Sequence, residues 1–124
     1  MPNDSLRVDL SPGARGEWVL VCTGPLTIQT LFTFREAVQG LDASHPLILD
    51  LTGVPYMDSA GLGTLVGAFV SGRRSGRQMV IAGAGPRIMA LIRMSNLEQF
   101  FPSYNSRVDA EAALSGVAPR SAWR

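Results

Sequence analysis

Apolar and polar residues alternate over Leu6–Leu10, so this segment is predicted to be a strand with one apolar face. A turn of glycine, proline and serine over 11–16 and a second apolar run over Glu17–Thr23 predict an antiparallel neighbour. Two later runs, Leu47–Leu49 and Met79–Ala82, are continuously apolar. Continuous apolar runs are typical of strands that are covered on both faces.

Between and after these strands, apolar residues recur at helical spacing. The first predicted helix covers Ile28–Leu41 with Thr27 as its N-cap, and the second begins at Ser59. A third begins at Pro86, and a last one covers Asp109–Leu114. Strands that alternate with helices predict a single α/β domain, a mixed sheet of about four to five strands with about four helices layered against it.

Length and composition limit the function classes. The chain has 124 residues, which suits one domain, and we expect it to span 1–116 with a loose tail at 117–124. A net charge of +1 argues against a general attraction to nucleic acid, and no segment is long and apolar enough for membrane insertion. The N-terminus lacks the apolar core of a signal peptide, so a cytoplasmic protein is expected. The lone Cys22 lies in an apolar strand and is predicted to be buried.

Residues that commonly carry catalysis are scarce. The single histidine, His45, precedes a proline in a predicted loop, and too few histidines and cysteines are present for a metal site. The glycine turn at 83–85 lacks the remaining residues of a phosphate-binding loop, so we interpret it as a strand-to-helix turn. Arg73, Arg74 and Arg77 are interpreted as a solvated helix end. The sequence therefore predicts no enzyme and no cofactor.

The Asp58-Ser59 pair stands directly before the second predicted helix. An aspartate there caps the helix, and a serine there places a hydroxyl at the positive end of the helix dipole. The outward face of this helix carries no charge, although a solvated helix usually does. The residues of that face are Ala60, Thr64, Gly67, Ala68 and Ser71. Gly61, Gly63 and Gly67 each lower helix stability by about 1 kcal/mol, so helix stability alone does not favour them. Since small residues allow another chain to come close, we predict a flat, close-approach surface for another protein. A second copy of the chain could cover the same surface.

The sequence over 47–69, LILDLTGVPYMDSAGLGTLVGAF, resembles the signature of the STAS domain, as found in bacterial anti-sigma factor antagonists. Downstream, Val80–Gly83 and the residues Ile88, Ile92, Asn96, Leu97 and Phe100 are similar to the family's later strand and helix. Asn96 stands where a glycine is usual, and asparagine tolerates the left-handed backbone of a helix end. The similarity extends over nearly the whole chain in element order.

The resemblance implies that Ser59 is phosphorylated by an anti-sigma factor with GHKL-type serine kinase activity. It further implies that the unphosphorylated protein binds that anti-sigma factor and frees the sigma factor, and that a PP2C-type phosphatase removes the phosphate. The residues that we predict to bind the partner are Asp58, Ala60, Gly61, Gly63, Thr64, Gly67 and Thr27.

Two further departures from the family pattern occur, and the first of them, the loss of an acidic pair, leaves an alternative open. The family often has Gly-Glu-Leu-Asp where this chain has Gly24, Pro25, Leu26 and Thr27, and Ala60 excludes a second phosphoserine. The alternative is a STAS domain that binds constitutively, as a subunit of a lipid-transport or multi-protein signalling assembly. A small phosphate-binding enzyme that uses the turn at 83–85 is a third, weaker interpretation.

Overall fold

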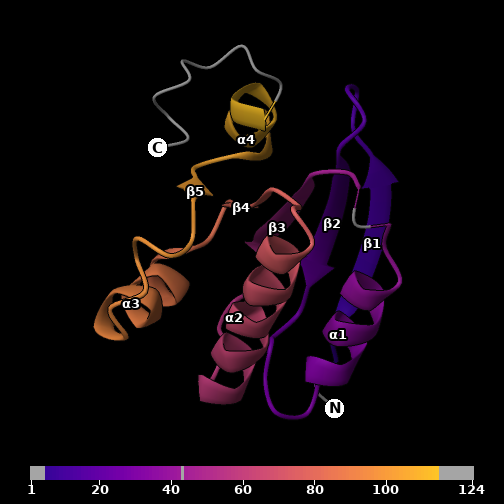
Figure 1. Cartoon of the computed structure of the whole chain (residues 1–124). Coiled ribbons are helices and arrows are strands. Elements are labelled where there is room, and N and C mark those ends of the chain that lie inside the picture. Colours follow the sequence, from indigo (N-terminus) through magenta and orange to yellow (C-terminus); the bar gives the residue numbers. More distant parts are fainter. Residues whose placement is uncertain (1–4, 43, 115–124) are drawn as a thin grey trace.

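The computed structural model describes residues 5–42 and 44–114, and it has the predicted mixed sheet (Figure 1). The strands lie side by side in chain order. They are β1 (Arg7–Pro12), β2 (Trp18–Thr23), β3 (Leu47–Gly53), β4 (Met79–Ala82) and β5 (Ser103–Tyr104). β1 pairs with β2 antiparallel, and the remaining neighbours pair parallel. The prediction of a hairpin followed by parallel crossovers is therefore confirmed.

The helices are α1 (Leu31–Gln39), α2 (Ser59–Arg74), α3 (Pro86–Met94) and α4 (Arg107–Leu114). α1, α2 and α3 bury Phe34, Leu65 and Ile88 in one core cluster, together with Leu49 of β3. The opposite face of the sheet packs on α4 in a smaller cluster. Its buried members are Val19, Ile48, Val80, Ala82 and Ala110. Strands β3 and β4 are thus covered on both faces, as their continuous apolar runs predicted.

The start of α1 differs from the prediction. The helix begins at Leu31 rather than Ile28, and Thr27 is not its N-cap. The Thr30 hydroxyl accepts a hydrogen bond from the Thr27 N–H at 2.9 Å and donates one to the Pro25 carbonyl at 2.9 Å. These two hydrogen bonds of the Thr30 side chain stabilise a turn over residues 28–30, and this turn leads into the helix.

Several smaller expectations are settled by the described residues. Asn96 has φ 59°, so the left-handed conformation predicted for it is confirmed. Gly83 has φ 72° and its added Cβ would clash with Thr52, which gives this turn a structural reason for its glycine. Leu10 is 44% exposed because β1 lies at the edge of the sheet. The predicted tail at 117–124 lies outside the described residues. None of the helices in 5–42 and 44–114 has the length and apolar character needed to cross a bilayer.

Candidate partner-binding site

The candidate site is built at the N-terminus of α2, where Asp58 is the N-cap. Its backbone is extended, with φ −100° and ψ −175°, and its Oδ1 accepts a hydrogen bond from the Gly61 N–H at 2.8 Å. This bond satisfies one of the backbone donors that a helix start leaves unpaired. It also lowers the pKa of the Asp58 carboxyl below its usual value. Asp58 is therefore an ionised, fixed neighbour of Ser59 at neutral pH.

Asp58 also joins α2 to the loop between β2 and α1. Its Oδ2 accepts a hydrogen bond from the Ile28 N–H at 3.1 Å, and its own N–H donates to the Leu26 carbonyl at 3.3 Å. Leu26 and Met57 further form an isolated parallel bridge. Residues 26–28 are thereby held against the start of α2, and Ile28, which is 63% exposed, lies beside Asp58.

Ser59 is the first residue of α2, and the structure places it on the surface. Within the described part of the chain, its hydroxyl makes no hydrogen bond, so no internal contact would be lost if the oxygen were modified. The neighbouring backbone donors supply the partial positive charge of the helix start. The position is therefore sterically open and electrostatically suited to an added anion.

The glycines of α2 fall into two kinds. A Cβ added to Gly61 would clash with the carbonyl oxygen of Leu26, and one added to Gly72 would clash with the sulfur of Met79. A Cβ added to Gly63 or Gly67 would meet no atom of the described residues within 4 Å. Gly61 is buried, and close packing of the loop against α2 explains this glycine without a partner. Packing within the chain does not explain Gly63 and Gly67.

The surface along α2 is one wall of a groove, not the flat face that we predicted. α1 stands beside α2 on the same face of the sheet (Figure 1), and a groove of about 590 Å³ runs between them. Glycine has no side chain and alanine only a methyl group, so these residues of α2 leave this space unfilled. The lining residues are Phe34, Arg35, Val38, Gln39 and Leu41 from α1 and its end, Ala60, Gly63, Thr64, Gly67, Ala68, Ser71 and Gly72 from α2, and Ser75 and Arg77 beyond it.

The structure brings most of the predicted partner residues together. Ala60, Gly63, Thr64 and Gly67 line the groove, and Asp58 lies at the start of the same helix. Thr27 is half-buried in the loop, where its hydroxyl accepts a hydrogen bond from the Gln29 N–H at 3.2 Å.

The contribution of α1 was missed by the sequence patterns. Phe32 is 66% exposed, with the guanidinium of Arg35 5.5 Å from its ring centre. The exposure of Phe32 could be read from the sequence, because this residue falls outside the apolar stripe of its own helix.

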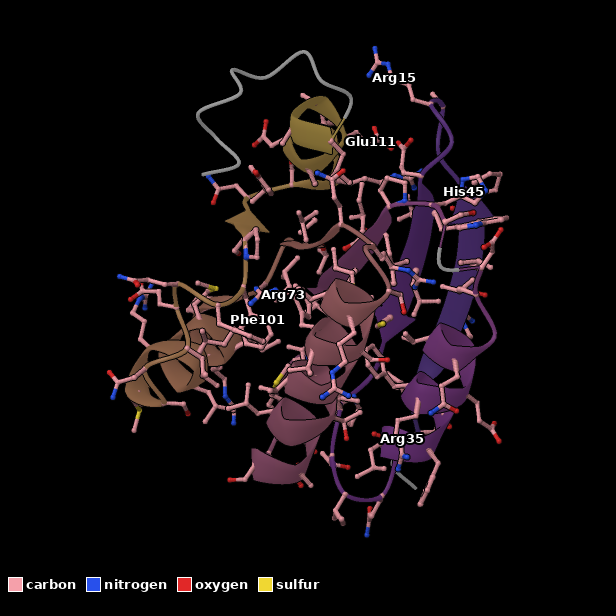
Figure 2. The ribbon with its side chains drawn as sticks, in the orientation of Figure 1. Arg15, Arg35, His45, Arg73, Phe101 and Glu111 are labelled. Carbon is pink, nitrogen blue, oxygen red and sulfur yellow. The ribbon has the colours of Figure 1, made fainter. Side chains whose placement is uncertain are left out.

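The interpretation of the three arginines near the end of α2 as a solvated helix end holds for Arg73 and Arg74 but not for Arg77. Arg73 lies 4.8 Å from the ring centre of Phe100, on the side of α2 that faces α3 (Figure 2). Arg77 is half-buried, lines the groove, and donates a hydrogen bond from Nη2 to the Leu41 carbonyl at 3.1 Å. Arg73 and Arg74 match the expectation, since both are exposed residues in the last turn of α2.

The comparisons with known proteins agree with this geometry. The family model described as the STAS domain matches residues 8–110. The chain belongs to the STAS domain family. The anti-sigma F factor antagonist of Paenibacillus polymyxa is 30% identical over 108 residues, which cover 84% of this chain and 92% of that protein.

Solved structures share the fold of this STAS domain. The crystal structure of an anti-sigma factor antagonist from Mycobacterium paratuberculosis matches with a TM-score of 0.79 at 23% identity, over 90% of this chain and 96% of that one. The phosphorylated form of the Bacillus cell fate determinant SpoIIAA matches with a TM-score of 0.66 at 17% identity, over 87% and 99% of the two chains. At these identities the likeness concerns the fold.

Other reactive groups of this STAS domain lie away from the candidate site. His45 is exposed at the opposite end of the domain from the start of α2 (Figure 2), and its Nε2 is 3.8 Å from Asp42 Oδ2. Cys22 is buried as predicted, and burial, with a smaller effect of Asp50, raises the pKa of its thiol to about 12. No group of three potential metal ligands occurs among residues 5–42 and 44–114.

Proposed function

We propose that this STAS domain is an anti-sigma factor antagonist that binds its anti-sigma factor in the unphosphorylated state and releases it when Ser59 carries a phosphate. The observation that carries the proposal is the exposed Ser59 hydroxyl at the first position of α2, where the groove between α1 and α2 begins at Ala60. The name of the Paenibacillus relative supports the general role. A regulator of this kind acts by binding rather than by catalysis, and we expect it to act in the cytoplasm.

Electrostatics explains why the modification would act on the partner and leave the fold intact. A phosphate adds about −1.5 to −2 charges at pH 7, directly beside the ionised Asp58 carboxylate. Backbone donors at the helix start offset part of that charge within the domain. A partner packed on the same face would have to desolvate it without such donors, which opposes binding. The phosphorylated form of Bacillus SpoIIAA supports the proposal, because that protein has the same fold.

Two enzymes would act on Ser59, a kinase and a phosphatase. An anti-sigma factor of the GHKL kinase type transfers the γ-phosphoryl group of ATP to Ser59 Oγ, which loses its proton, and ADP leaves. A PP2C-type phosphatase then hydrolyses the serine–phosphate bond with water and regenerates the hydroxyl together with inorganic phosphate.

The test mixes the purified chain with ATP and, one at a time, the GHKL-type anti-sigma factors encoded in the same genome. Intact-mass spectrometry should show one added phosphate on the wild type and none on Ser59→Ala. Ser95→Ala is the control, since Ser95 is an exposed serine outside the groove lining, and it should be modified like the wild type. A phosphate that persists on Ser59→Ala would refute the assignment.

One sequence feature favours the constitutive alternative, because residues 24–27 lack the acidic pair that the family often has. In the structure Pro25 and Leu26 are buried, so this loop presents Ile28 in place of carboxylates. A constitutive subunit would acquire no phosphate in the assay above. It would also bind its partner equally well as wild type and as Ser59→Glu.

A further inference from the structure

The charged side chains that line the groove between α1 and α2 are all positive. Its lining includes two arginines, Arg35 and Arg77, and no aspartate or glutamate. Its floor is apolar, formed by side chains such as Phe34, Val38 and Leu41. A complementary occupant therefore combines an apolar face with negative charge.

Arg77 is fixed in place at the end of the groove, where the Asp42 carboxylate acts on it electrostatically without forming an ion pair. Its Nη2 donates to the Leu41 carbonyl, and its Nε is buried without a hydrogen-bond partner. Among the described residues it forms no ion pair. The nearby Asp42 carboxylate accepts a hydrogen bond from the Ser44 N–H at 3.0 Å and lies 3.8 Å from His45. Because Arg77 lines the groove and forms no ion pair within the described part of the chain, its guanidinium can pair with a carboxylate that enters from outside.

The shape of the groove favours a helix as the occupant. The groove follows α2 from Ala60 to beyond its last turn, and the 16 residues of α2 span about 24 Å at 1.5 Å per residue. Gly63 and Gly67 leave open space along this wall. Helix axes pack about 8–10 Å apart, and small residues at the contact allow the closest approach. An amphipathic helix laid in a groove is a common mode of protein recognition.

We propose that this groove receives an amphipathic, acidic helix of the anti-sigma factor, with carboxylates that reach Arg35 and Arg77; this inference rests on the function proposed above. It also gives the phosphate a direct role. Ser59 immediately precedes the Ala60 end of the groove, so its phosphate lies where an acidic helix enters. Repulsion between like charges acts over about 8 Å at physiological salt. Because the partner helix is negatively charged, a phosphate on Ser59 repels it and releases the partner.

Two matched pairs of variants test the charge of the occupant. Arg77→Gln removes the charge in the groove, and Arg74→Gln removes one from the same end of α2 outside the lining. Ser71→Glu and Ser71→Gln place side chains of equal size in the groove and differ only in charge. Affinity for the anti-sigma factor that binds the wild type is measured by calorimetry at about 0.1 M and 1 M NaCl, where the Debye lengths are about 10 Å and 3 Å. Thermal unfolding confirms that each variant is folded.

Arg77→Gln is expected to weaken binding about tenfold at the lower salt concentration, and Arg74→Gln less than about twofold. Ser71→Glu should bind more weakly than Ser71→Gln, and the difference should shrink at high salt. Equal affinities within both pairs would overturn the acidic helix. Dimerisation of the wild type that Ser71→Glu abolishes would also overturn it, because a second copy would then fill the groove.

Ser59→Glu, measured in parallel, separates this inference from the proposed function. If Ser59→Glu weakens binding while both matched pairs bind alike, the switch stands and the acidic helix is refuted. If the groove variants weaken binding as expected while Ser59→Glu and enzymatically phosphorylated protein bind like the wild type, the acidic helix stands and the switch is refuted. A wild-type chain that binds none of the anti-sigma factors of its genome overturns both.

Discussion

Alanine substitutions at Gly63 and Gly67 of α2 should raise stability and weaken partner binding. Gly63→Ala and Gly67→Ala add a methyl group where no atom lies within 4 Å, so no internal contact opposes them. Gly61→Ala adds the same methyl group against the Leu26 carbonyl, which cannot move without disturbing the loop that Asp58 holds. The three variants therefore compare identical chemistry in open and in filled space.

The magnitudes follow from helix propensity and packing. Alanine is about 1 kcal/mol more favourable than glycine in a helix interior, so Gly63→Ala with Gly67→Ala should raise the free energy of unfolding by about 1–2 kcal/mol. For a domain of this size that corresponds to a rise in Tm of about 3–10 °C. At Gly61 the clash costs about 1–3 kcal/mol, and because the contact is with backbone we expect the upper end and a net loss of about 2 kcal/mol.

Urea unfolding followed by far-UV circular dichroism gives the stabilities, and calorimetry gives the affinity for the anti-sigma factor. The Gly63→Ala, Gly67→Ala double variant should be more stable than the wild type and yet bind more weakly, by about 5- to 150-fold if the packing clashes with the partner cost about 1–3 kcal/mol in all. A double variant that gains stability and binds like the wild type would refute close approach at the groove. One that loses stability would refute the open space itself.

Three further predictions concern single residues. Asp58→Ala should lower the free energy of unfolding by about 1–2 kcal/mol in urea titrations, since it loses the hydrogen bonds from Gly61 and Ile28. Because the folded pKa of Asp58 is lowered, this difference should be full above the unfolded value of about 3.9 and fade as the pH falls through the folded pKa; a difference that grows in acid would contradict the cap. The Cys22 thiol, with its pKa near 12, should resist a thiol reagent at about pH 8 and react once the chain is unfolded in urea; stoichiometric labelling of the folded protein would show that it is accessible. Asn96→Gly should be neutral or stabilising in thermal unfolding while Asn96→Ala costs about 1 kcal/mol, and equal stability of the two would argue against the left-handed backbone.

The buried strands and the helix starts could be predicted from the sequence, because residue types close together in the chain determine them. The continuous apolar runs of β3 and β4 required cover on both faces, and the structure supplies it through α2 and α3 on one side and α4 on the other. Asp58 caps α2, and Pro86 stands in the first turn of α3, as their residue types indicated. These features depend on a few neighbouring residues, so one sequence suffices to predict them.

The features that failed depend on contacts between distant segments. Thr27 was a reasonable N-cap by type, but the hydroxyl of Thr30 binds the loop and moves the helix start to Leu31. Gly61 and Gly63 read alike in the sequence, and only the position of Leu26 distinguishes the buried glycine from the open one. The groove likewise needs α1 and α2 on the same face of the sheet, so Arg35 and Arg77 could not be assigned to it beforehand.

The most direct test of the account compares one preparation in two states. Protein phosphorylated by its anti-sigma factor kinase is divided, one half is treated with a PP2C-type phosphatase, and calorimetry measures the affinity of each half for that anti-sigma factor. We predict that the dephosphorylated half binds at least about tenfold more tightly, with mass spectrometry placing the only difference at Ser59. Equal affinity of the two halves would contradict a switch at the start of α2.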